Sequence, residues 1–299
     1  MADPVSPTRW HYLLPLTTVL IWSGNTLVTK LAHGRIDPEA ILFYRWLLAA
    51  LLMTPLLLPL LWRQRHLLRP HLLRLLVLGV LGMVVYQGLA YYAAATTSAT
   101  NMAILLALSP LLAGLIGSAL TADRLTWGVV IGGLVSFAGV VWLISGGAPL
   151  TLLHTRPQPG DALMLIAVTA NALYGALLLR WQFPFSHWLQ LYIQILAAML
   201  VLTPWFAVTT TAPVTAAGLP LVLYAGVLAS VGAPLLWIKS IQALGPGRAS
   251  LFLNLTPVFV ALAAMLWLDE QLAGYHLVGG LLALAGVALG QRIRRPLRR

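Results

Sequence analysis

The sequence contains no cysteine and very little charge. The absence of cysteine from its 299 residues excludes disulfides, thiolate metal sites and a cysteine nucleophile, but it does not identify a compartment. Charged residues make up 8% of the chain, and only 7 of them are acidic. Hydrophobic residues make up 60%, and the mean hydropathy is +0.89. These values lie far outside those of soluble globular domains, so the composition predicts an integral membrane protein.

The apolar residues are arranged in long continuous runs. A helix needs roughly 20 mainly apolar residues to cross a hydrocarbon core of about 30 Å. The runs do not alternate apolar with polar residues, which argues against an outer-membrane barrel. The breaks between them predict an all-α polytopic protein of ten spans, near 11–31, 38–61, 72–94, 98–119, 126–145, 161–180, 187–208, 218–240, 248–268 and 274–291.

The basic residues predict the orientation of these spans. The N-terminal "MADPVSPTRWHYLL" has no basic segment and no cleavage site of small residues, so we expect a retained first span. With ten spans, both termini share one side. Fourteen basic residues fall there: Arg9, Arg63, Arg65, Arg69, Arg74, Arg124, Arg180, Lys239, Arg248, Arg292, Arg294, Arg295, Arg298 and Arg299. The opposite side has Lys30, Arg35 and Arg156.

This charge bias predicts cytoplasmic termini in a cell (inner) membrane protein, because cytoplasmic loops are enriched in Lys and Arg. Residues 1–10 then form a cytoplasmic N-terminus, and 292–299 form a basic cytoplasmic tail. We interpret the tail as a topology anchor that contacts anionic lipid headgroups. No nucleic-acid partner is expected.

An internal repeat divides the chain. At an offset of 147, residues 110–140 align without a gap to 257–287 and match at nine of 31 positions, including Pro110/Pro257 and a Gly-Gly pair. At an offset of 149, "FYRWLLAALLMTP" aligns with "YIQILAAMLVLTP". The predicted units are therefore 11–145 and 161–291, joined by a linker at 146–160.

Five spans per unit is an odd number, so the second unit enters the membrane from the opposite side. Such inverted repeats exchange conformations about a pseudo-two-fold axis, with the substrate site near the midplane. The repeat therefore favours a transporter over an anchor or a scaffold.

Several segments resemble the EamA-type, ten-helix branch of the drug/metabolite transporter superfamily. The likeness lies in "IWSGNTLVTK", in "FYRWLLAALL" and in "IQALGPGRASLFLNLTPVFVALAAMLWLDEQLAGYHLVGGLLALAGVAL". The first unit departs from it, because "TADRL" stands where the second has "LDEQL" and leaves only Asp123 of the acidic pair. The resemblance implies export of amino acids, related metabolites or drugs. The nearest subgroup is the YddG-type aromatic amino-acid exporters, but the resemblance does not select a substrate.

The ionisable residues suggest what the cavity binds. Every acidic residue falls at a span end or in a loop, which weakens a mechanism in which a buried acid binds proton and cationic drug alternately. Arg45 lies inside span two, and its repeat counterpart is Gln194. Its planar guanidinium is suited to a substrate carboxylate. The alternative is that it snorkels outward or satisfies free backbone carbonyls.

Uncharged polar and aromatic residues near mid-span complete the predicted substrate site. At the offset of 149, Trp22 aligns with Asn171 and Asn25 with Tyr174, so each unit offers an i, i+3 pair on one helical face. The alternative is hydrogen bonding between packed helices, or for Tyr91 a place in the interfacial aromatic belt. The candidate substrate-binding residues are Trp22, Asn25, Arg45, Tyr86, Gln87, Tyr91, Asn171, Tyr174, Trp237 and Asn254.

Two prolines interrupt spans four and nine. Pro110 and Pro257 cannot donate to the carbonyls of Leu106 and Leu253, so we expect bends that shape the cavity rather than contact substrate. A hydroxyl of Ser109 or Thr256, or water, can satisfy each free carbonyl. Glycines such as Gly132 and Gly139 are expected to let helices pack closely.

These patterns together predict a secondary transporter that exports a small, partly apolar solute by alternating access, with amino acids as the first candidate. Without a buried acid, facilitated diffusion is favoured over proton antiport. The alternatives are a multidrug or cationic-metabolite exporter and, from another class, a membrane-embedded lipid-handling enzyme. No catalytic motif, metal site or cofactor is expected. The expected partners are a small-molecule substrate and membrane lipid, and a monomer is favoured over an oligomer.

Overall fold

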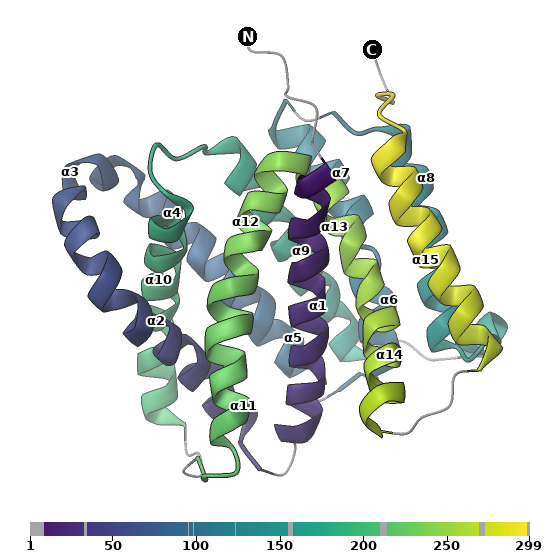
Figure 1. Ribbon diagram of the computed structural model, residues 1–299, viewed down its shortest axis with the longest axis horizontal. Coiled ribbons are helices and arrows are strands. Elements are labelled where there is room, and N and C mark those ends of the chain that lie inside the picture. The colour runs from purple at the N-terminus through teal and green to yellow at the C-terminus, as the bar shows by residue number, and fades with distance from the viewer. Residues whose placement is uncertain are drawn as a thin grey trace.

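The structure is a computed structural model of the full chain (Figure 1). It describes residues 9–32, 35–94, 96–97, 99–122, 124–154, 158–209, 214–268 and 273–297. The ends of both predicted cytoplasmic segments, 1–8 and 298–299, lie outside this part, as does Asp123.

The described part of the first predicted unit is helical. Its elements are α1 (Arg9–Ala32), α2 (Pro38–Arg63), α3 (Arg65–Leu68), η1 (Arg69–His71), α4 (Leu72–Gly79), η2 (Val80–Val85), α5 (Tyr86–Ala94), α6 (Ala99–Leu106), α7 (Ser109–Leu120) and α8 (Trp127–Ile144). A short helix, η3 (Pro149–His154), lies in the predicted linker.

The second unit follows the same plan. Its elements are α9 (Pro159–Arg180), α10 (His187–Val208), α11 (Leu219–Leu223), η4 (Tyr224–Gly232), α12 (Ala233–Leu244), α13 (Pro246–Ser250), η5 (Leu251–Leu255), α14 (Thr256–Leu268) and α15 (Gly274–Arg292). Helix occupies every predicted span. Among the described residues, eight helices are long and apolar enough to cross a membrane by length and composition, those in spans one and nine not being included. The predicted all-α polytopic fold is confirmed.

The third helical segment of each unit contains a π-helical stretch. These stretches are η2 in the first unit and η4 in the second. The offset of 147 carries residues 80–85 onto 227–232, which lie inside η4. π-Helical segments are rare and occur often at functional sites. Their equivalent placement in the two units therefore makes the residues around η2 and η4 candidates for a functional site.

The last helices of the two units, α8 and α15, lie side by side (Figure 1) and share a glycine contact. A Cβ atom on Gly132 would lie 2.4 Å from the carbonyl oxygen of Gly286, and one on Gly139 would lie 2.7 Å from that of Gly279. The offset of 147 turns Gly132 into Gly279 and Gly139 into Gly286. Each unit therefore makes the same contact with the other, which is the reciprocal pattern that a two-fold axis produces.

Both prolines sit at helix breaks, as expected. Pro110 is the second residue of α7, and the hydroxyl of Ser109 donates to the free carbonyl of Leu106 at 2.6 Å. Pro257 is the second residue of α14, after the 3₁₀ segment η5. There the backbone N–H of Thr256 donates to the carbonyl of Leu253, so a tighter turn does what the hydroxyl does at the first break.

The start of α1 and the end of α15 lie at the same end of the bundle, at the top of Figure 1. The chain after α15 is tied to the start of α8. Trp127 N–H donates to the carbonyl of Arg295 at 2.9 Å, and Leu297 N–H donates to that of Leu125 at 2.9 Å. The described part of the predicted tail is thus fastened to the first unit.

Candidate functional site

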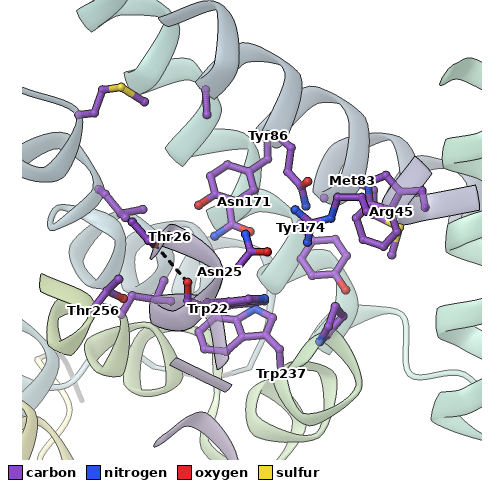
Figure 2. A pocket seen from close by; sticks show the side chains of 18 residues that line it. Trp22, Asn25, Thr26, Arg45, Met83, Tyr86, Asn171, Tyr174, Trp237 and Thr256 are labelled. Atoms are coloured by element: carbon purple, nitrogen blue, oxygen red, sulfur yellow. Dashed lines mark hydrogen bonds between the residues drawn. The ribbon is translucent and has the colours of Figure 1, made fainter. Parts of the chain in front are cut away.

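A cavity of about 360 Å³ lies between the two units. Its lining residues come from both halves of the chain and include the side chains labelled in Figure 2. They are Trp22, Asn25, Thr26, Arg45, Trp46, Gly82, Met83, Tyr86, Gln87, Ala90, Met102, Leu106, Asn171, Tyr174, Pro234, Trp237, Leu253 and Thr256. The structure thus brings eight of the ten predicted substrate-binding residues together around one space.

Many lining residues are repeat equivalents of one another. Five pairs contribute both members: Trp22/Asn171, Asn25/Tyr174, Gln87/Pro234, Ala90/Trp237 and Leu106/Leu253. The cavity therefore straddles the place where the two units face each other. Most pairs differ in chemistry, so related backbones present different side chains to an occupant.

The irregular helix segments position this lining. Gly82 and Met83 belong to η2, and Tyr86 and Gln87 begin the helix that follows it. In the second unit, Pro234 follows η4 in the same way. A π-helical turn changes the rotation of the residues that follow it, which helps direct these side chains towards the cavity.

Arg45 is the one charged residue among those that line the cavity. Its side chain is 5% exposed, its Nε donates to the Ser230 hydroxyl at 2.7 Å, and its guanidinium carbon lies 5.3 Å from the centre of the Trp46 ring. Because Ser230 belongs to η4, the bond joins the two halves of the chain. Burial among these partners contradicts the alternative that Arg45 snorkels out of the bundle. Charged groups are rarely placed at such depth without a reason, which makes Arg45 the first candidate for a functional charge in this cavity.

Polar side chains face Arg45 across the cavity. Figure 2 shows Asn25, Tyr86 and Asn171 extending into the same space as the guanidinium. The Tyr174 hydroxyl donates to Oε1 of Gln194 at 3.1 Å, and both side chains are buried. Since Gln194 is the repeat counterpart of Arg45, the two equivalent positions serve different tasks, one fixing a lining tyrosine and the other placing a charge.

An aromatic wall bounds the cavity on another side. The ring centroids of Trp22 and Trp237 lie 5.4 Å apart with planes tilted at 56° (Figure 2). The Trp22 indole N–H donates to the carbonyl of Ala229 at 3.3 Å, and the Thr26 hydroxyl donates to the carbonyl of Trp22 at 3.1 Å. The bond to Ala229 holds the Trp22 indole in place, and the paired rings offer an apolar surface to a ligand.

The cavity is displaced towards one end of the bundle. Thr26 and Met102 line it, and Met102 lies near the start of α6. Their repeat counterparts, Gly175 and Ala249, are buried. The cavity therefore extends towards the end at which α1 ends, opposite the end where α1 begins and α15 ends.

Two predicted substrate-binding residues are not placed in the cavity. Asn254 is 1% exposed, and its amide nitrogen donates to the carbonyl of Ala107 at 3.3 Å and to the Ser136 hydroxyl at 2.7 Å. In this structure the Asn254 amide therefore bridges neighbouring segments and does not line the cavity. The side chain of Tyr91 lies outside the part that the structure describes. Pro110 and Pro257 are absent from the lining, in keeping with a bending role.

Sequence reasoning also missed several lining residues, namely Thr26, Trp46, Gly82, Met83, Ala90, Met102, Leu106, Pro234, Leu253 and Thr256. Helical spacing offered a signal for some of them, because Thr26 lies four residues after Trp22 and Ala90 four after Tyr86. Leu106 and Leu253 are the residues whose carbonyls the two prolines leave free. No such signal pointed to Trp46, because adjacent residues of an α-helix point in different directions and Arg45 therefore does not predict where Trp46 lies.

The described residues contain no group of three or more His, Cys, Asp or Glu side chains able to hold a metal ion. What the lining offers is one guanidinium, several amides and hydroxyls, and aromatic surface. Such a set is suited to holding and releasing a small polar-apolar molecule.

Comparison with known proteins identifies the family. The model of the EamA-like transporter family matches residues 9–145 and again residues 158–290. The chain is 29% identical over 291 residues to an uncharacterized transporter of Archaeoglobus fulgidus, covering 94% of this chain and 97% of that protein. It is 27% identical over 223 residues to a probable terminal-alkyne amino-acid exporter of Streptantibioticus cattleyicolor, covering 72% of this chain and 71% of that protein.

A solved crystal structure shares the fold, with a TM-score of 0.75, 19% identity and coverage of 93% of this chain and 95% of the other. The chain belongs to the EamA-like transporter family, which confirms the resemblance drawn from the sequence. Family and relatives indicate a transporter rather than an enzyme.

Proposed function

We propose that this EamA-like transporter exports a small, partly apolar solute that carries a carboxylate, with amino acids as the first class to test. The observation that carries the proposal is Arg45, a single buried charge in a cavity lined by equivalent residues of both units. Planar guanidinium groups bind carboxylates through paired, charge-assisted hydrogen bonds.

Size and lining support this class of substrate. A volume of about 360 Å³ lies at the lower end of the range for small-molecule sites, and it is suited to a molecule of amino-acid size. The amide oxygens of Asn25 and Asn171 would accept hydrogen bonds from a substrate ammonium, while Trp22 and Trp237 would pack against an apolar side chain. The relative named as a probable amino-acid exporter points to the same class.

The charge of the lining disfavours the first alternative, a multidrug or cationic-metabolite exporter. Aromatic faces do attract cations, but Arg45 would repel a cation in the same confined space. Lys239, which lies in α12, is not among the lining residues. The part of the chain that the structure describes has no cluster of three or more His, Cys, Asp or Glu side chains, so it offers no observation that favours the second alternative, a lipid-handling enzyme.

The mechanism that we propose is alternating access by two inverted repeats. Two observations support it. The α8–α15 contact is reciprocal, and the lining residues Thr26 and Met102 have repeat counterparts, Gly175 and Ala249, that are buried. In the exchanged state, Gly175 and Ala249 would line the cavity, and Thr26 and Met102 would be buried. If the bias of basic residues holds the termini in the cytoplasm, the cavity described here is the outward-facing one of a cell-membrane protein.

We further propose a facilitator that acts as a monomer. Proton-coupled carriers use ionisable groups that alternate between proton and substrate, most often carboxylates. With no carboxylate in the lining, solute flux would follow the solute gradient.

The test is uptake and counterflow in proteoliposomes with a panel of amino acids, run with and without a pH gradient. We expect saturable flux of amino acids with apolar or aromatic side chains, unchanged by the pH gradient, and none in protein-free liposomes. An absence of flux across the whole panel refutes the substrate class. Flux that requires the gradient refutes only the facilitator.

A further inference from the structure

Asn254 joins the two helix breaks at repeat-equivalent positions. Its amide donates to the carbonyl of Ala107 at 3.3 Å, and these two residues are separated by 147 positions, the offset that relates the repeats. The same amide donates to the Ser136 hydroxyl at 2.7 Å. All three residues are buried, with exposed fractions of 3% or less.

This contact is near the axis that relates the units but is not symmetric. The residue equivalent to Asn254 is Ala107, and the residue equivalent to Ser136 is Ala283. The reciprocal contact would have the side chain of Ala107 facing the carbonyl of Asn254 and the side chain of Ala283. A methyl group donates no hydrogen bond, so neither polar bond has an equivalent in the exchanged arrangement.

We propose that Asn254 is a positioning residue that holds the carrier in the state described here, with the cavity on the side of Met102. The inference rests on the alternating-access part of the proposed function. An interaction present in only one of two exchanging states shifts their populations by its own free energy. Two buried hydrogen bonds are enough for a shift of about tenfold.

The neighbours of Asn254 explain how it would act on the cavity. Leu253 and Thr256 line the cavity, and so does Leu106, the residue before Ala107. The amide thus ties together the two breaks whose adjacent residues form the cavity wall. Movement of either break away from the other breaks the bond with Ala107.

A pair of single-cysteine reporters tests the proposal, because the native chain has no cysteine. Met102→Cys reports the state described here, in which residue 102 lines the cavity. Ala249→Cys reports the exchanged state, since Ala249 is its repeat equivalent and is fully buried now. Both are labelled with a water-soluble maleimide in detergent, where each side of the protein is accessible.

With Asn254 present, we expect Met102→Cys to react much faster than Ala249→Cys. Adding Asn254→Ala should raise the rate at Ala249→Cys relative to that at Met102→Cys by about tenfold. The exchanged pair Ala107→Asn with Asn254→Ala moves the amide to the other unit, where it can make only the bond equivalent to the one with Ala107, so it should raise the rate at Ala249→Cys further than Asn254→Ala alone does.

The control is Gln190→Ala. Gln190 is also a fully buried amide, but it donates to the carbonyl of Phe185 within the second unit. This variant removes a comparable polar group and leaves the bonds of Asn254 to Ala107 and Ser136 in place, so the rate ratio should stay unchanged. An unchanged ratio in folded Asn254→Ala protein overturns the proposal, as does an equal shift in the control.

The same experiment separates this proposal from the proposed function. A shifted ratio together with no amino-acid flux would reject the substrate class and support the role of Asn254. Flux with Ala249→Cys unreactive in every variant would reject both the role of Asn254 and the exchange of states.

Discussion

Replacement of Arg45 by Gln tests the proposed carboxylate site directly. The variant keeps a side chain that can hydrogen-bond to Ser230, whose hydroxyl accepts from Arg45 Nε at 2.7 Å, so the contact between α2 and η4 can persist. What it removes is the positive charge. A hydrogen bond to a charged group contributes about 2 kcal/mol, which corresponds to about 30-fold in affinity.

The assay compares an amino acid with its amide, which lacks the carboxylate. In proteoliposomes, Arg45→Gln should raise the KM of the amino acid about 30-fold and change that of the amide only slightly. Arg45→Lys is the matched control: it keeps the charge but loses the planar fork, so its effect on the amino acid should be intermediate. An equal loss of transport for both solutes would refute the reasoning and assign Arg45 a purely structural role.

Three further substitutions test the packing and the lining. Gly139→Leu should lower the free energy of unfolding of the detergent-solubilised protein by about 3 kcal/mol, because the side chain would clash with α15, and its Tm should fall. The control is Gly88→Ala, whose added Cβ would have nothing within 4 Å, so its Tm should not fall. Tyr174→Phe should cost about 1 kcal/mol of stability because Gln194 Oε1 loses its donor; an unchanged Tm would contradict that bond. Trp22→Ala should raise the KM of aromatic amino acids about fivefold more than that of alanine, and an equal rise for both would exclude a side-chain wall there.

Helical periodicity accounts for part of the cavity lining. Trp22 and Asn25 lie three residues apart, as do Asn171 and Tyr174, and both pairs line the cavity. The period of an α-helix fixes which side chains share a face. The repeat alignment then predicted that the two faces are equivalent, but it did not predict which cavity they line.

The structure places Asn254 away from the cavity for a geometric reason. The segment η5 is a 3₁₀ helix, in which residues three apart share a face. Leu253 and Thr256 therefore point into the cavity together, and Asn254 is turned to the neighbouring helices. Polarity at mid-depth was visible in the sequence, but the direction of the side chain depended on which neighbouring segments pack against η5.

Arg45 presented a different limit. Its depth in the second span was readable, but a guanidinium at that depth can point to lipid, to backbone or to a cavity. Only the approach of η4, more than 180 residues away in the chain, decided between them.

The sequence by itself predicted the membrane class, the helical segments, the repeat and the two helix breaks. Hydropathy and the positions of prolines can be read from short stretches of chain, and the repeat can be read by aligning two such stretches. The tertiary structure alone decided that Arg45 meets Ser230, that Asn254 bridges the breaks and on which side the cavity lies. These contacts join residues that lie far apart in the chain, so no short stretch of sequence predicts them.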